Sequence, residues 1–193
     1  MKPRLILASS SPRRRELLAS IGLEFDVIPS HIPEVKRSDE RAEEYVARLS
    51  REKARAVAAG HRDRWVLAAD TTVVLGEELL EKPADEADAK RMLAAIAGHT
   101  HLVHTAVTLM RVEPAYADTH ICTSEVRMLP LSESDIAWYV ATREPLDKAG
   151  SYAAQGVGGL FIDSIHGSFT NVVGLPLASL FQMLRKAGID PLQ

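Results

Sequence analysis

Three consecutive arginines stand where the sequence predicts the start of a helix. The apolar residues 5–8 are followed by Ser9, Ser10, Ser11 and Pro12, and then by Arg13, Arg14 and Arg15. Backbone N–H groups and the dipole already make a helix start positive, so further positive charge is unfavourable there unless an anion is bound. A helix start with small residues and arginines is typical of a phosphate site. The alternative, which a run of arginines alone favours, is that they are solvated or pair with neighbours such as Glu16.

A lysine interrupts the apolar face of the long helix expected at about residues 41–59. Lys53 comes four residues after Leu49 and four before Val57, so the helical period turns it towards the interior. Burying an ammonium group without a partner is costly. Lys53 must therefore either extend to the edge of the core or meet an anion, which would be a carboxylate or a phosphate, and the sequence leaves both readings open.

Two carboxylates are candidates for acid–base or metal chemistry. The apolar residues 65–69 predict a buried strand that stops at Asp70. Ligands of open α/β sheets bind beyond the carboxyl ends of strands, so Asp70 there could hold a divalent ion or activate a water molecule. The alternative is an aspartate that only caps a helix or a turn. Glu34, in a polar loop after the second expected strand, is a weaker acidic candidate.

Other chemical patterns are weaker or absent. Lys82 precedes Pro83, which keeps it extended and presents it either to a ligand or to solvent. His99 and His101 would share one face of a strand and His104 the other, so they do not predict a metal site. The sequence has neither a Walker phosphate loop nor a G-x-S-x-G elbow, which disfavours a Walker ATPase and an α/β-hydrolase.

The strands and helices that must position these residues alternate along the chain. Strands are expected at residues 5–8, 25–29, 65–69, 71–75, 79–82, 101–112, 121–129 and 160–162. Helices are expected at residues 12–21, 41–59, 85–97, 132–139 and 176–188. This order predicts an α/β fold with a mixed, partly antiparallel sheet flanked by helices. A length of 193 residues without a repeat or linker predicts a single domain over residues 1–193.

Composition excludes several classes of protein. With 23 basic and 26 acidic residues the net charge is −3, which argues against broad binding to a nucleic acid polymer or an anionic membrane and leaves only local basic sites. The long uncharged stretch at residues 164–184 contains glycine, proline, asparagine and histidine, so we interpret it as a loop and a core helix rather than a membrane span. A single cysteine, Cys122, favours a reducing compartment and a cytoplasmic location.

Taken in order, the motifs resemble those of the Maf family of nucleoside triphosphate pyrophosphatases over nearly the whole chain. They are LASSSPRR at residues 7–14, Glu34, SREKA around Lys53, AADTTVV at 68–74, Lys82-Pro83, HTAV at 104–107, EPLDKAGSYAAQG at 144–156 and IHGSFTNVVGLP at 165–176. Each motif alone is weak. The ordered set argues against the purely structural alternatives given above for the arginines, Lys53 and Asp70.

The resemblance implies two lobes around a cleft, a fold related to that of inosine triphosphate hydrolases. It also implies divalent-metal-dependent hydrolysis of a nucleoside triphosphate to the monophosphate and pyrophosphate. Asp70 matches the general base, and Lys53, Lys82 and Glu34 match the other catalytic positions. Asp70 and Glu34 would hold Mg²⁺ or Mn²⁺, and the expected substrate-binding residues are Ser9, Arg13, Arg14, Thr71 and Gln155.

Within the family, three positions are associated with the choice of base, and here they hold Arg13, Thr71 and Gln155. DKAG at residues 147–150, together with Gln155, resembles the branch that acts on dTTP and UTP, whereas the 7-methyl-GTP branch carries an acidic residue at the Gln155 position. A neutral amide can both donate to and accept from a pyrimidine edge. The resemblance therefore implies a dTTP and UTP pyrophosphatase whose partner is a free nucleotide.

Two other functions remain open at this stage. One is a nucleotide-binding regulator of septum formation, although a passive triphosphate binder has little use for the extra carboxylate of Asp70. The other is a pyrophosphatase for 7-methyl-GTP or another non-canonical nucleotide such as ITP. The sequence shows no interface signature and leaves a homodimer open.

Overall fold

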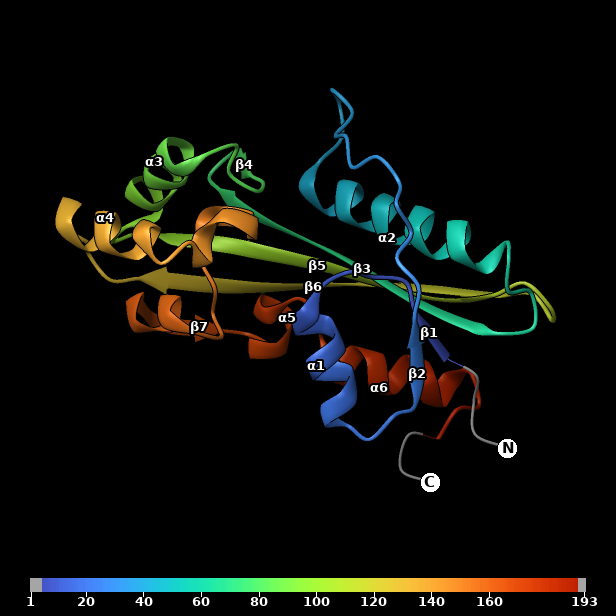
Figure 1. Cartoon of the computed structure of the whole chain (residues 1–193). Coiled ribbons are helices and arrows are strands. Elements are labelled where there is room, and N and C mark those ends of the chain that lie inside the picture. The colour runs from blue at the N-terminus through green and yellow to red at the C-terminus, as the bar shows by residue number, and fades with distance from the viewer. Residues whose placement is uncertain (1–4, 191–193) are drawn as a thin grey trace. The chain divides into compact units, whose positions relative to one another are not determined.

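The computed structural model describes residues 5–190, so the first four and last three residues of the expected domain lie outside it (Figure 1). Its strands are β1 (Leu5–Leu7), β2 (Phe25–Val27), β3 (Trp65–Leu75), β4 (Glu78–Leu80), β5 (Thr100–Arg111), β6 (Tyr116–Met128) and β7 (Ile162–His166). Its α-helices are α1 (Pro12–Ser20), α2 (Ala42–Ala58), α3 (Glu86–Ile96), α4 (Glu133–Ala141), α5 (Phe169–Val173) and α6 (Leu177–Lys186). Short 3₁₀ helices η1 (Glu144–Asp147), η2 (Ala149–Ser151) and η3 (Val157–Phe161) lie between α4 and β7.

The strands form a mixed sheet in the order β2-β1-β3-β5-β6-β7, with β4 beside β3. Strand β1 runs parallel to β2 and to β3, whereas β4 is antiparallel to β3 and β7 is antiparallel to β6. The prediction of an α/β fold with a mixed, partly antiparallel sheet and flanking helices is confirmed.

The contacts divide the chain into two compact units. The first unit runs to Asp70 and adds Thr105–Cys122 and the residues from Gly174 onward. The second unit comprises Thr71–His104 and Thr123–Val173. The long strands β3, β5 and β6 pass from one unit into the other.

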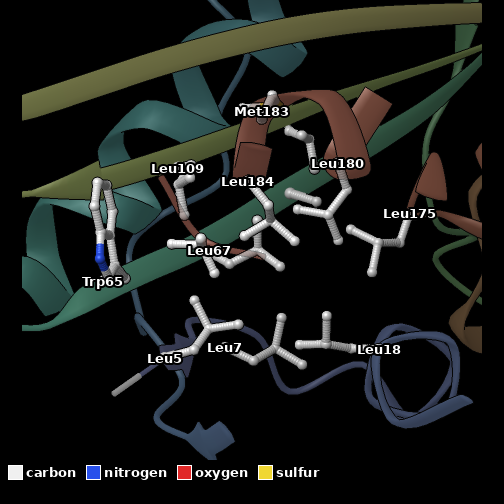
Figure 2. Packing of buried hydrophobic residues seen from close by; sticks show 13 residues of the cluster. Leu5, Leu7, Leu18, Trp65, Leu67, Leu109, Leu175, Leu180, Met183 and Leu184 are labelled. Atoms are coloured by element: carbon white, nitrogen blue, oxygen red, sulfur yellow. The ribbon is translucent and has the colours of Figure 1, made fainter. Parts of the chain in front are cut away.

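The first unit has helices on both faces of its strands because successive strand residues point to opposite faces. Residues 5 and 7 of β1 and 65 and 67 of β3 pack with α1 and α6, where Leu18, Leu180, Met183 and Leu184 are buried (Figure 2). Residues 6, 66 and 68 of the same strands pack with Ala54, Val57 and Ala58 of α2. Figure 1 shows α2 on one side of β1 and β3, and α1 and α6 on the other.

The second unit has its own apolar core. It joins β3, β4, β5 and β6 to the buried faces of α3 and α4 and includes Val73, Leu80, Leu93, Ile96, Val103, Val126, Met128, Ile136 and Tyr139. Burying one such leucine or isoleucine contributes about 1.5–3 kcal/mol. Each unit is therefore organised around apolar residues of its own strands and helices.

Some elements differ from the sequence-based expectation. The expected strands 65–69 and 71–75 are one continuous strand, β3, so Asp70 lies inside a strand and does not end it. The expected strand 160–162 begins only at Ile162 because residues 157–161 form η3, and α5 was not predicted. Within residues 5–190, no helix is both long and apolar enough to cross a membrane.

Candidate active site

Lys53 and Asp70 form a buried ion pair in the first unit. Alternation along β3 puts Asp70 on the face that also carries Val66 and Ala68, and α2 covers this face with the apolar stripe that includes Lys53. Lys53 Nζ lies 2.6 Å from Asp70 Oδ1, and the side chains are 8% and 7% exposed. The prediction that Lys53 turns inward is confirmed, and of the two readings that the sequence left open the structure shows contact with an anion, the Asp70 carboxylate. The positive charge of Lys53 explains how β3 can continue through a buried aspartate.

Glu34 completes a triad around the same ammonium group. Its Oε1 lies 2.7 Å from Lys53 Nζ, and its side chain is 42% exposed, so this carboxylate forms the solvent side of the triad. Burial raises the pKa of Asp70, while the positive charges of Lys53 and Arg14 oppose the rise and the negative charge of Glu34 adds to it. A carboxyl with a raised pKa is a better proton acceptor near neutral pH than an ordinary aspartate.

Arg14 lies within electrostatic reach of this triad at the start of α1. Its Nε donates a 2.8 Å hydrogen bond to the carbonyl of Gly174, and its Nη1 lies 3.4 Å from the hydroxyl of the buried Ser9. Burial lowers the pKa of Arg14, and the charge of Asp70 opposes that shift. Pro12 begins the helix as expected, and Arg13 is half-buried beside Arg14. Ser9 and Arg14 thus belong to one bonded cluster at a helix start, the arrangement expected of an anion site.

The loop that carries Glu34 is bound to α2 by residues that the sequence analysis missed. Arg48 donates from Nη2 to the carbonyl of Val35 at 2.9 Å and from Nε and Nη2 to the two carboxylate oxygens of Glu40, each at 2.7 Å. These hydrogen bonds raise the pKa of Arg48 and lower the pKa of Glu40. Tyr45 adds a 3.4 Å hydrogen bond from its hydroxyl to the Glu34 carbonyl. The clamp is bidentate and stabilises the loop against the helix that carries Lys53.

Three expected site residues belong to the second unit. Lys82 is exposed just before the buried Pro83, Thr71 is half-buried, and Gln155 is exposed between η2 and η3. Their part in one site with Asp70 stays a prediction.

The histidines do not converge. His101 shares a 2.8 Å hydrogen bond with the hydroxyl of Tyr152, and His104 shares one of 2.9 Å with the hydroxyl of Thr123. His99 is exposed. Over residues 5–190 there is no group of three or more His, Cys, Asp or Glu side chains that could hold a metal ion.

Asp70 and Glu34 nevertheless suit a magnesium-type site. Both carboxylates approach the same ammonium group, so they present hard oxygen ligands to one small region. Mg²⁺ is usually bound in proteins by one or two carboxylates together with substrate phosphates and water. The pair therefore fits a metal that arrives with a phosphate-bearing substrate.

This arrangement can accept a proton and offset phosphate charge in one region. Asp70 supplies a buried carboxylate with a raised pKa, and Lys53 and Arg14 supply two cations in electrostatic contact with it. Such a set suits the attack of water on a phosphoric anhydride, whose transition state needs both a base and positive charge.

Comparisons with known proteins give the family. A model of the Maf-like protein family matches residues 4–187. A protein of Anaeromyxobacter dehalogenans named dTTP/UTP pyrophosphatase is 51% identical over 191 residues, covering 97% of this chain and 96% of that protein. Proteins of the same name from Myxococcus xanthus and Syntrophus aciditrophicus are 48% and 46% identical, covering 96% of this chain and 93% and 90% of their own lengths.

Among solved structures, that of the Staphylococcus aureus Ham1 protein aligns with a TM-score of 0.45 and 16% identity, over 65% of this chain and 71% of that one. The family match covers almost every residue that the structure describes and includes all the expected site residues. The chain therefore belongs to the Maf-like protein family.

Proposed function

We propose that this protein is a nucleoside triphosphate pyrophosphatase that hydrolyses dTTP and UTP to the monophosphate and pyrophosphate. The observation that carries the proposal is the buried Lys53–Asp70 pair with Glu34 at its open side. Full-length relatives at 46–51% identity that are named dTTP/UTP pyrophosphatase support it. The substrate is a free nucleotide, and the lone Cys122 is consistent with the cytoplasm as the location.

In the proposed reaction Asp70 is the general base. It accepts a proton from a water molecule as the water oxygen bonds to the α-phosphorus, and the bond from that phosphorus to the bridging oxygen of pyrophosphate breaks. Lys53 holds the Asp70 carboxylate in place and, with Arg14, offsets the negative charge of the triphosphate. Ser9 and the first backbone N–H groups of α1 bind phosphate oxygens.

The proposed cofactor is Mg²⁺ or Mn²⁺, held by Asp70 and Glu34. When bound, the ion supplies positive charge to the phosphate oxygens and lowers the barrier to displacement of pyrophosphate. These two carboxylates would hold the ion, and each lies beside the Lys53 ammonium group, Asp70 at 2.6 Å and Glu34 at 2.7 Å. Lys82 adds a further cation for the phosphates.

Base selection is assigned to Gln155, with Thr71 and Arg13 as further contributors. Thymine and uracil present an acceptor at O4 and a donor at N3, and a carboxamide offers one donor group and one acceptor to such an edge. Gln155 is exposed, as a residue that reads a ligand must be. An acidic side chain at this position would instead favour a positively charged base.

The test is a substrate panel. Purified protein with Mg²⁺ or Mn²⁺ is offered dTTP, UTP, CTP, 7-methyl-GTP and ITP, and pyrophosphate and monophosphate are measured, with a chelator as the control. We expect dTTP and UTP to give the highest kcat/KM, and the chelator to abolish turnover. Tight dTTP binding without any product would contradict the proposal and favour a nucleotide-binding regulator. A preference for 7-methyl-GTP or ITP would contradict the assigned substrate.

A further inference from the structure

Gln155 is an exposed residue between two tightly held segments of the second unit. Ser151, Tyr152 and Ala153 before it are buried, and so is Gly158 after it. A residue that reads a base must be exposed, but it is selective only if its backbone cannot shift to suit a different base. The contacts on the two sides of Gln155 therefore bear on selectivity.

Glu144, the first residue of η1, holds the segment that follows Gln155. Its carboxylate accepts hydrogen bonds from the backbone N–H of Val157, at 3.0 Å to Oε2 and 3.2 Å to Oε1, and from that of Gly158 at 3.3 Å. These are the first N–H groups of η3, which have no partner inside their own helix. A carboxylate that accepts from backbone N–H groups makes hydrogen bonds stronger than neutral ones.

Gly156 shows how closely the Glu144 carboxylate approaches the chain. A Cβ atom built on Gly156 would lie 2.2 Å from Glu144 Oε1, and the residue has a φ of +131°. The φ value favours glycine at this position, because side chains of L-residues rarely adopt it. The residue directly after Gln155 is therefore in contact with the carboxylate that also binds the next two N–H groups.

Tyr139 of α4 holds the segment on the other side. Its hydroxyl accepts a 3.0 Å hydrogen bond from the N–H of Ala153. A Cβ built on Gly158 would lie 2.3 Å from the same hydroxyl, so Tyr139 also contacts the later segment. The His101–Tyr152 hydrogen bond of 2.8 Å adds a third anchor. The backbone on both sides of Gln155 is thus bound to the core of the unit.

We propose that Glu144 is a positioning residue for base selection: it holds the backbone that carries Gln155, so that the Gln155 amide meets only a base edge of matching donors and acceptors. The inference rests on the proposed function, in which Gln155 contacts the base. Glu144 itself touches no substrate. It acts by holding the backbone so that the Gln155 amide cannot turn over, as it would have to do to satisfy cytosine, whose N3 and N4 groups reverse the donor and acceptor order of uracil.

The test compares the ratio of kcat/KM for dTTP to that for CTP in the wild type, Glu144→Gln, Gln155→Ala and the double variant. Glu144→Gln keeps the size of the side chain but has one acceptor oxygen and no charge, so it weakens the hydrogen bonds from the Val157 and Gly158 N–H groups. Because one such hydrogen bond contributes about 1 kcal/mol, we expect the ratio to fall about fivefold, through KM for dTTP, with kcat changed less than about twofold. Glu133→Gln, at an exposed glutamate of α4, is the matched control and leaves the ratio unchanged.

The double variant separates positioning from a loss of stability. In the Gln155→Ala background, Glu144→Gln should change the ratio no further, because the amide that it positions is gone. Gly156→Ala, which pushes a Cβ against the carboxylate, should lower the ratio as Glu144→Gln does. The inference is overturned if Glu144→Gln keeps the wild-type ratio, or lowers kcat equally for both nucleotides.

Failure of the proposed function gives a different result. In that case the wild type releases no pyrophosphate from any nucleotide, and the same four proteins are compared by calorimetric binding of dTTP and CTP. A lower preference for dTTP in Glu144→Gln supports the positioning role even then. Equal preferences in the wild type and Glu144→Gln overturn it.

Discussion

In the first unit the buried polar centre is charged and paired, whereas in the second unit it is neutral. Lys53 and Asp70, the two charged residues that are buried among residues 5–190, both belong to the first unit. The second unit buries His101, His104, Ser124, Ser151 and Asn171 instead. Burial disfavours the charged form in both units, since it raises the pKa of Asp70 and lowers the pKa of His101 to about 4.

The difference lies in the partners that each unit supplies. Asp70 has Lys53 at 2.6 Å, so a charge can persist in the first unit despite burial. His101 has the neutral hydroxyl of Tyr152, and its buried Nδ1 has no hydrogen-bond partner within residues 5–190, so it stays neutral. A retained charge suits proton transfer and phosphate binding, and a neutral, well-packed network suits the rigid support of a base-reading residue. The comparison therefore predicts different kinds of defect for the two units.

The largest effect is expected for Asp70→Asn. An amide cannot take a proton from water, so we expect kcat to fall about 10³–10⁴-fold, or about 4–5.5 kcal/mol, for every nucleotide in equal proportion. Steady-state kinetics with dTTP and UTP measure it, and Asp39→Asn, at an exposed aspartate of the same unit, is the control. A change in the ratio between nucleotides, in place of a uniform loss, would contradict the division between the units.

The buried ion pair predicts a stability effect for Lys53→Met. The variant leaves the buried Asp70 carboxylate without its closest cation, which costs about 3–5 kcal/mol in the free energy of unfolding. Adding Asp70→Asn to Lys53→Met should recover more than half of the loss, because the buried charge is then removed. Urea unfolding of the two single variants and the double variant measures this, and additive losses would show that the pair is not coupled.

The neutral histidine predicts a pH dependence of stability for the second unit. Because the folded-state pKa of His101 is about 4, below its ordinary value of 6.5, its contribution is fully present above pH 6.5 and is lost as the pH falls towards 4. The loss reaches about 3 kcal/mol. The Tm of thermal unfolding should fall less steeply from pH 7 to pH 4 for His101→Gln than for the wild type. His166→Gln, at an exposed histidine of β7, should keep the wild-type slope.

The smallest effect is expected at the Arg48 clamp, because Arg48 acts on the site only by holding the loop that carries Glu34. Arg48→Met releases the loop that carries Glu34, and we expect kcat/KM for dTTP to fall about tenfold, as the loss of a hydrogen bond to a charged group would give. The kcat/KM of Arg48→Lys should lie between the values of the wild type and Arg48→Met. Arg51→Met, at an exposed arginine of α2, should keep the wild-type kcat/KM. If Arg48→Met has the same effect in a Glu34→Ala background, the clamp does not act through Glu34.

The sequence predicted most elements because their signals are local. Pro12 begins α1, alternation and apolar runs predicted β1 and β3, and the helical period turned Lys53 inward. Asp70 was misplaced at a strand end because a charged residue normally stops a buried strand. Only the tertiary contact with Lys53 neutralises Asp70 and lets β3 continue to Leu75.

The supports of the site were not predictable in the same way. Arg48 reaches Glu40 and Val35 across a loop, and Glu144 reaches Val157 and Gly158 across another, so no helical or strand period links the partners. The glycines near Gln155 indicated a turning loop, but this pattern is the same whether or not another residue holds the loop in place. The tight approach of the Glu144 carboxylate to Gly156 appears only in the folded chain.

In the proposed reaction this protein directs water to the α-phosphorus of a nucleoside triphosphate through the Asp70 centre. Hydrolysis of dTTP in water enriched with oxygen-18, followed by mass spectrometry of both products, tests it directly. We expect one labelled oxygen in dTMP and none in pyrophosphate. Label in pyrophosphate, or release of orthophosphate and dTDP, would contradict it.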